Sequence, residues 1–215
     1  QYCSLLADFQ EHTKDVVLCS ENGAFIVDDG QELYAGCMTR EQVKMSLDAA
    51  YAVEGIEPVV CAKYVTYTTS QEMADFLGSP KFKYKMAVVD DLYDIDEDII
   101  KISMAVMNGE DNVQMFRKVR AVLDESLNLM TSGPDCMDTG VYGINKGRAV
   151  EVLQEMWNIT PAETMVIGDQ YNDVDMFDKA DYSFAMAGAV EGVKKKARFI
   201  AGSNNEGGVV KAIRE

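Results

Sequence analysis

The sequence predicts an α/β protein in which a module of mixed helices and strands interrupts a doubly wound parallel sheet. From residue 146 onward, short apolar runs alternate with helical segments, which is typical of a parallel sheet covered by helices. Between about Thr39 and Asp135, helical spacing and β-rich stretches are mixed, which indicates an α+β module. The chain has 215 residues, 47% of them hydrophobic, and can therefore bury the cores of two domains.

The first part of the chain reads as a strand, a turn and a second strand. Residues 16–19 and 24–27 are apolar runs, and residues 20–23 between them are typical of a turn. Asp28, Asp29 and Gly30 then form a second turn signal.

The middle module combines both kinds of pattern. Residues 41–53 have helical spacing, residues 64–69 are rich in β-formers, and residues 101–107 read as a strand. Apolar residues at three- and four-residue steps predict an amphipathic helix over residues 112–127. Aromatic residues of this module either line a sugar-sized pocket or belong to an ordinary core, namely Tyr64, Tyr67, Phe82 and Tyr84.

The last third of the chain alternates regularly between helix and strand. The pattern predicts helices over residues 146–157, 173–179 and 190–196, and strands over residues 165–167, 184–186 and 199–201. Because ligands of open parallel sheets bind at the carboxyl ends of the strands, we expect the site where strand 165–167 ends, at Asp169.

Charge narrows the choice of ligand. Lys and Arg number 20 and Asp and Glu number 36, so the formal charge is −16, which repels nucleic acids and anionic membrane surfaces. An anionic small substrate then needs a local positive group, a metal ion or a lysine. The five cysteines lack a C-x-x-C pair and read as core residues of a reducing compartment, which predicts a cytoplasmic protein.

Residues 168–173, Gly-Asp-Gln-Tyr-Asn-Asp, are the most informative segment. Asp169 and Asp173 are four positions apart with Asn172 between them, and like charges so close need a positive partner. Oxygen ligands at a strand end suit a hard cation such as Mg²⁺. The alternative is that Asp169 only caps the following helix.

Lys146 stands at the predicted start of helix 146–157. A cation is disfavoured there by a few tenths of a kcal/mol up to about 1 kcal/mol, so the position suggests a task such as binding a phosphate at the helix end. The alternative is a solvated surface lysine.

Four motifs in order resemble the haloacid dehalogenase superfamily, and most of all its Cof-type sugar-phosphatase branch with a type IIB cap. They are Asn145-Lys146-Gly147, the segment 168–176, Ala185-Met186-Ala187-Gly188-Ala189 and the segment 203–209. The resemblance implies a Rossmann-like core made of residues 1–34 and 135–215, with residues 35–134 as an α/β cap.

The resemblance also implies roles for four residues. Asp169 would be a Mg²⁺ ligand, Asn172 would contact the phosphoryl group, and Lys146 would steady its charge. Asp173 would act with Lys146 in catalysis, by supporting it or a ligand of the metal. Two departures from the family pattern lie in loops near this site, Gly188 in place of Asn and Gly207 in place of Asp.

The family's nucleophile motif D-x-D-G-T does not occur in these 215 residues. The resemblance implies Mg²⁺-dependent hydrolysis of small phosphomonoesters, namely sugar phosphates, through an aspartyl phosphate. Because the nucleophile motif is missing, we expect the chain as given to be inactive. The rival functions are a phosphomutase and a non-catalytic remnant that binds metal and phosphate. The expected partner is a small phosphorylated metabolite. The sequence leaves open whether the protein is a monomer or a homodimer.

Overall fold

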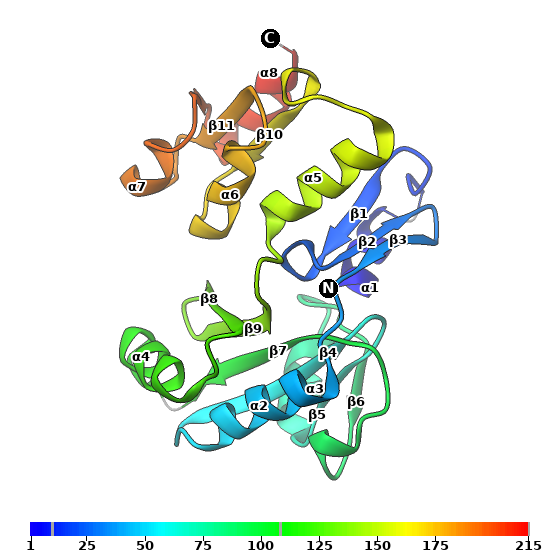
Figure 1. Cartoon of the computed structure of the whole chain (residues 1–215). Helices are drawn as coiled ribbons and strands as arrows, with labels where there is room; N and C mark the ends of the chain where they lie inside the picture. Colours follow the sequence, from blue (N-terminus) through cyan, green and yellow to red (C-terminus); the bar gives the residue numbers. More distant parts are fainter. Residues whose placement is uncertain (10, 108, 215) are drawn as a thin grey trace. The chain divides into compact units, whose positions relative to one another are not determined.

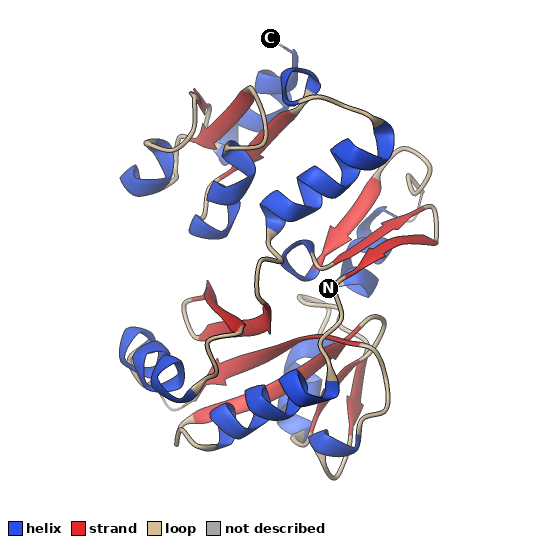
Figure 2. Cartoon of the chain, viewed as in Figure 1, coloured by secondary structure: helices blue, strands red, loops and turns tan. Residues whose placement is uncertain are grey.

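The computed structural model describes residues 1–9, 11–107 and 109–214, and its contacts divide the chain into two units (Figure 1). Unit 1 is Gln1–Gly143 and unit 2 is Ile144–Glu215. Unit 1 holds mainly antiparallel sheets and unit 2 a parallel sheet flanked by helices (Figure 2). The predicted core and cap, divided after residues 34 and 134, stay a prediction.

Unit 1 begins with helix α1 and a three-stranded antiparallel sheet. The elements are α1 (Tyr2–Phe9), β1 (Val17–Ser20), the 3-10 turn η1 (Glu21–Gly23), β2 (Phe25–Asp28) and β3 (Gln31–Ala35). The predicted strand, turn and strand are confirmed, while β3 was not predicted. The turn is unusual because Glu21, Asn22 and Gly23 all have positive φ, at 52°, 56° and 95°, a conformation that costs energy for a residue with a Cβ.

The rest of unit 1 is a six-stranded sheet with three helices. The strand order is β6-β5-β4-β7-β9-β8. The strands are β4 (Ile56–Ala62), β5 (Thr66–Thr68), β6 (Met86–Val88), β7 (Ile99–Val106), β8 (Leu127–Gly133) and β9 (Cys136–Val141). The helices are α2 (Arg40–Tyr51), α3 (Gln71–Gly78) and α4 (Asn112–Val122), and η2 (Leu92–Asp94) is a short 3-10 turn.

The two faces of this sheet differ in chemistry because side chains alternate along each strand. One face is apolar and packs against α2 and α4, through Leu47, Val60, Ile102, Met104, Met115 and Met137. The other face carries Cys61, Lys101, Ser103 and Asp138 at the alternate positions of the three central strands.

The helix predicted over residues 112–127 is five residues too long, since α4 ends at Val122. Leu123 adopts extended backbone, with φ −77° and ψ 137°. The Arg120 guanidinium donates to the carbonyl oxygens of Leu123, Asp124 and Leu127, which holds the chain in the turn. Leu127 then starts β8, so its apolar side chain marks a strand of the core and does not continue the helix.

Unit 2 confirms the predicted parallel sheet, with the order β10-β11-β12. Its elements are α5 (Lys146–Trp157), η3 (Pro161–Glu163), β10 (Met165–Gly168), η4 (Tyr171–Asp173), α6 (Val174–Phe177), β11 (Tyr182–Met186), α7 (Glu191–Lys194), β12 (Phe199–Ala201), η5 (Asn204–Glu206) and α8 (Gly208–Arg214). The predicted helices over 173–179 and 190–196 are shorter than expected. Val166, Phe177, Ala185 and Val193 form the centre of the core.

None of the described helices has the length and apolar character needed to cross a membrane.

Candidate active site

Asp173 is the centre of the contacts in unit 2. It is buried, and its Oδ1 pairs with the Lys146 ammonium at 2.5 Å. Its Oδ2 accepts hydrogen bonds from the backbone N–H groups of Asp169 and Gln170, both at 2.9 Å. One carboxylate thereby joins the start of α5 to the loop that follows β10, and charge-assisted hydrogen bonds of this kind are the stronger ones.

Two glycines make this close approach possible. A Cβ added at Gly168 would overlap the Asp173 side chain, with Cγ at 2.7 Å and Oδ2 at 2.8 Å. A Cβ at Gly147 would lie 2.5 Å from the carbonyl oxygen of Asp175, at the first turn of α6. A larger residue would therefore clash at either position, and the two glycines allow α5 and the segment after β10 to pack together.

Lys146 is placed by the N-terminus of α5. The Asn145 side chain accepts a hydrogen bond from the Arg148 N–H at 2.8 Å, which satisfies one of the unpaired donors of the first turn. The Lys146 side chain keeps a third of its surface exposed, so its ammonium pairs with Asp173 and still faces solvent. That ammonium and the positive end of the helix together favour an anion.

Asp169 follows β10 directly and is half-buried. Within the described part of the chain, its carboxylate makes no hydrogen bond or ion pair, in contrast to that of Asp173. No group of three His, Cys, Asp or Glu side chains is close enough to hold a metal among the described residues. Mg²⁺ commonly takes one or two protein carboxylates and completes its shell with waters and substrate phosphates, so the Asp169 carboxylate fits one such position.

Asn172 lies in η4 between Tyr171 and Asp173, and is half-buried. Two contacts fix this loop. Asp173 accepts a hydrogen bond from the Asp169 N–H directly after β10. Tyr171 packs on α7 so closely that a Cβ at Gly192 would lie 2.5 Å from the tyrosine hydroxyl. The four predicted site residues are thus brought together at one end of the parallel sheet, on α5 and the β10 loop. Their roles stay predictions.

The two departures from the family pattern differ in their surroundings. A Cβ at Gly188 would meet nothing within 4 Å, so space does not require glycine there. Gly207 has φ +68°, a conformation that favours glycine.

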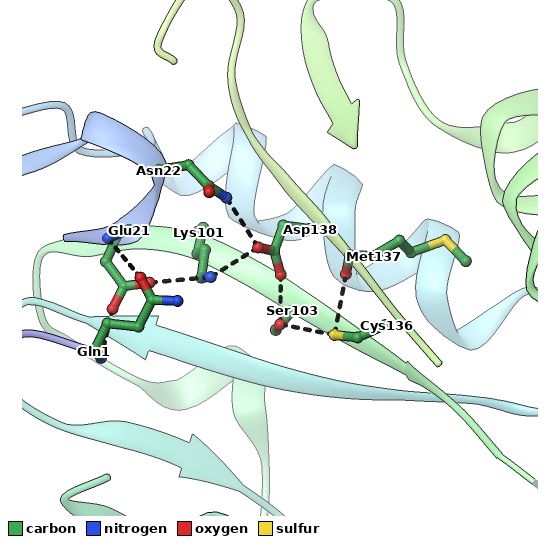
Figure 3. A network of polar contacts seen from close by, with 8 residues as sticks. All are labelled: Gln1, Glu21, Asn22, Lys101, Ser103, Cys136, Met137 and Asp138. Carbon is green, nitrogen blue, oxygen red and sulfur yellow. Dashed lines mark hydrogen bonds and ion pairs between the residues drawn. The ribbon is translucent and has the colours of Figure 1, made fainter. Parts of the chain in front are cut away.

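Sequence reasoning missed a second polar cluster, which lies in unit 1 (Figure 3). The Lys101 ammonium on β7 donates to Asp138 Oδ2 at 2.8 Å and lies 3.1 Å from Glu21 Oε2. Asn22 and Ser103 donate to the two oxygens of Asp138, at 3.1 and 2.5 Å. A charged residue inside the apolar run of residues 99–106 was the available signal.

The charges of this cluster, which we call the buried ion array (Glu21, Lys101 and Asp138), support one another. Each of the three residues is at most 6% exposed. Burial alone would lower the pKa of Lys101, but the carboxylates of Asp138 and Glu21 outweigh it and raise that pKa well above its usual value. Burial would likewise raise the pKa of Glu21, yet the charges of Lys101 and of the N-terminal ammonium of Gln1, which lies 2.8 Å from Glu21 Oε1, keep it below the usual value.

Comparisons with known proteins cover nearly the whole chain. The profile of the family described as haloacid dehalogenase-like hydrolase matches residues 3–213. The Escherichia coli (strain K12) protein named 5-amino-6-(5-phospho-D-ribitylamino)uracil phosphatase YbjI is 26% identical over 218 residues, which cover 99% of this chain and 79% of that protein.

Solved structures share the fold. The Streptococcus mutans UA159 protein SMU.1108c superposes with a TM-score of 0.87 at 26% identity, covering 99% of this chain and 81% of that one. A structure described as a HAD subclass IIB sugar phosphatase superposes with a TM-score of 0.79 at 18% identity, covering 97% and 78%, which shows likeness of fold. On the match of the family profile, this chain belongs to the haloacid dehalogenase-like hydrolases.

Proposed function

We propose that this chain supplies the charge-stabilising part of a phosphatase that hydrolyses small phosphomonoesters, sugar phosphates foremost. The observation that carries the proposal is the bridge from Lys146 through Asp173 to the backbone of Asp169. It joins a cation, a helix N-terminus and a carboxylate at the end of a parallel sheet, where ligands of such folds bind. The name of the Escherichia coli relative, a phosphatase, agrees with this chemistry.

Four residues of the chain would have separate roles in binding the phosphoryl group. The Lys146 ammonium neutralises charge on the phosphoryl oxygens, and the Asn172 amide contacts the same group. Asp173 is a positioning residue, because it holds Lys146 and fixes the loop that carries Asp169. Asp169 would hold Mg²⁺, which when bound supplies positive charge to the phosphoryl oxygens and orients them.

The covalent step needs a carboxylate that these 215 residues do not offer in a D-x-D-G-T motif. In that step an aspartate oxygen bonds to phosphorus while the ester bond breaks and the alcohol leaves with a proton. Water then attacks the phosphorus of the aspartyl phosphate, which releases inorganic phosphate and restores the aspartate.

The proposal is tested by separating binding from turnover. Calorimetric titration of the 215-residue chain with inorganic phosphate and with Mg²⁺ should show phosphate binding that Lys146→Met abolishes and Mg²⁺ uptake that Asp169→Asn abolishes. In a polypeptide that joins this chain to a D-x-D-G-T segment, we expect Lys146→Met to lower kcat/KM for a sugar phosphate by roughly 100-fold.

Lys195→Met is the matched control, since Lys195 is an exposed lysine of unit 2 away from these contacts. Phosphate binding that survives Lys146→Met would refute the proposed site. Binding without turnover in the joined polypeptide would identify a non-catalytic remnant, and turnover that needs a sugar bisphosphate as activator would identify a phosphomutase.

A further inference from the structure

The six-stranded sheet of unit 1 has an open edge at β6. This strand ends the strand order and pairs with β5 alone (Figure 1). Backbone hydrogen bonds of 2.8 and 3.0 Å join β5 to Lys85 and Val89. Because backbone groups alternate in direction along a strand, the N–H and C=O groups of Met86 and Val88 point away from β5. Within the described chain they meet no other strand.

One face of this edge leads to an acidic hollow. Ala87 stands opposite Tyr67 of β5, and both Tyr67 and Val89 pack against the apolar core of unit 1. Lys85 lies two positions before Ala87 and therefore projects to the same face. A hollow of ≈ 380 Å³ on this face is lined by Tyr67, Val89, Ile95 and five carboxylates, those of Asp90, Asp91, Asp94, Asp96 and Glu97.

The acidic hollow carries unbalanced negative charge. Neither a lysine nor an arginine is among the described residues that line it. Asp96 pairs with Arg40, whereas Asp90, Asp91 and Asp94 form no ion pair in the described part of the chain. Neighbouring carboxylates repel one another, so a cation that reaches this hollow is favoured.

Three cations precede the same strand. Lys81, Lys83 and Lys85 occupy alternate positions before β6, and all three are exposed. Lys83 pairs with Asp8, but Lys85 forms no ion pair with the residues that the structure describes. Lysines at an edge strand usually discourage pairing with another chain. Here carboxylates follow the strand, so two copies that run antiparallel bring the basic end of one to the acidic end of the other.

The opposite edge of the sheet lacks this match. β8 ends the strand order on that side. Asp124 and Glu125 precede it and Asp135 follows it, all three of them exposed. An antiparallel pair of β8 strands would therefore place carboxylates opposite carboxylates, which is destabilising. Charge thus favours β6 as the edge that two copies can share.

We propose that the β6 edge is a dimer interface, at which two copies of this chain pair antiparallel and join their six-stranded sheets into one. A twofold axis at Ala87 places Met86 of each copy opposite Val88 of the other, and each of these pairs exchanges its outward N–H and C=O groups. Lys85 of each copy then stands opposite Val89 of the other, on the face of the acidic hollow and diagonal to Asp91. The inference goes beyond the proposed phosphatase function, because it uses no residue of the candidate active site.

The first test is the oligomeric state of the 215-residue chain. Sedimentation equilibrium should give a mass that approaches twice 23.8 kDa as the concentration rises. Val88→Pro removes an N–H that points away from β5, so it should make the chain monomeric and leave the β5 ladder intact. Lys85→Glu should weaken the dimer about tenfold, because it adds a carboxylate at both acidic hollows. Lys118→Glu, at an exposed lysine of α4, is the control and should leave the dimer unchanged.

A disulfide tests the register. The Ala87 residues of the two copies form a non-hydrogen-bonded pair with α-carbons about 4.5 Å apart, a separation that a disulfide can span. Ala87→Cys should therefore give a crosslinked dimer under mild oxidation, whereas Ser132→Cys on the β8 edge should not. The wild type, with its own five cysteines, gives the background.

Far-ultraviolet circular dichroism verifies that each variant is folded. A wild type that stays monomeric at its highest soluble concentration would overturn the proposal, as would a dimer that survives both Val88→Pro and Lys85→Glu. Crosslinking of Ser132→Cys in place of Ala87→Cys would move the interface to β8 and overturn it as well. None of these results would bear on phosphate binding at Lys146.

Discussion

Gly168 shows how one missing side chain fixes the geometry of the candidate active site. Asp173 folds back over the Gly168 α-carbon and reaches the backbone N–H groups of Asp169 and Gln170 from there. The overlap of an added Cβ would involve Cγ of Asp173 as well as its oxygen, so a rotation of the terminal carboxylate alone would not remove it.

Gly168→Ala should therefore destabilise unit 2 by roughly 3 kcal/mol, through overpacking and through the loss of hydrogen bonds to buried groups. Trp157 is the chain's single tryptophan and lies at the end of α5, so its fluorescence during urea unfolding reports on unit 2. Gly188→Ala is the control, because nothing lies within 4 Å of the added methyl group. Equal unfolding midpoints for the two variants would show that Asp173 does not depend on Gly168.

At the scale of residues, position along a strand was enough to predict that Asp169 lies where β10 ends, at the edge where polar groups of parallel strands gather, while its role stays a prediction. The same reasoning could not show that Asp173 is the shared partner of Lys146 and the β10 loop. The contact between Lys146 and Asp173 joins residues 27 positions apart, and it depends on how closely α5 approaches the loop. Gly147 and Gly168 permit that approach, yet in the sequence alone a glycine can equally mark a turn.

At the scale of elements, the start of α5 links local helix capping to the site. Asn145 is the N-cap residue and Lys146 the first residue of the helix. The direction of the Lys146 side chain, and hence its ion pair with Asp173, follows from where the helix begins.

Asn145→Ala should destabilise unit 2 by about 1 kcal/mol, the usual cost of losing an N-cap. Asn145→Ser, which can still accept from the Arg148 N–H, should restore most of that stability. Tryptophan fluorescence under urea measures both, and calorimetry with phosphate measures whether the anion site weakens with the cap. If Asn145→Ala and Asn145→Ser were equally stable, the 2.8 Å hydrogen bond would contribute nothing.

The elements that could be predicted have strong periodicity and clear ends. The helix predicted over residues 146–157 agrees with α5, and the strand predicted over 199–201 agrees with β12. β4 was missed, since Pro58 argues against a central strand. The structure resolves the conflict: β5 pairs only with Val60 and Cys61, so at Pro58 the strand has β7 as its neighbour on one side alone.

At the scale of the whole molecule, the net charge of −16 means that acidic side chains outnumber basic ones, so a buried lysine that pairs with buried carboxylates stabilises the fold. Glu21 and Asp138 are buried in unit 1, where a carboxylate without a cation is strongly destabilising. Lys101 neutralises part of that charge, and Asn22 adds a hydrogen bond to Asp138 from a turn with left-handed backbone. The array thereby helps to hold a conformation that would otherwise be strained.

The array predicts a pH dependence of stability with a definite sign. The pKa of Glu21 is lowered in the folded protein, so its contribution is present above its usual pKa of 4.5 and is lost as the pH falls through the folded value. The pKa of Lys101 is raised, so its contribution is fully present below 10.5 and does not change in acid. Wild-type unit 1 should therefore lose stability as the pH falls below about 4.5.

Lys101→Met should weaken this trend. At pH 7 the variant should be less stable by about 3–5 kcal/mol, because the buried Asp138 carboxylate loses its cation and Glu21 keeps only the N-terminal ammonium of Gln1 as a partner. Without Lys101, burial raises the pKa of Glu21 above its value in the wild type, so protonation in acid costs the variant less and the gap to the wild type should narrow as the pH falls from 7 to 4. Urea unfolding followed by far-ultraviolet circular dichroism measures the gap, with Lys44→Met, an exposed lysine paired with Asp48 on α2, as the control. A gap that stays constant with pH would show that Lys101 acts by packing and not by charge.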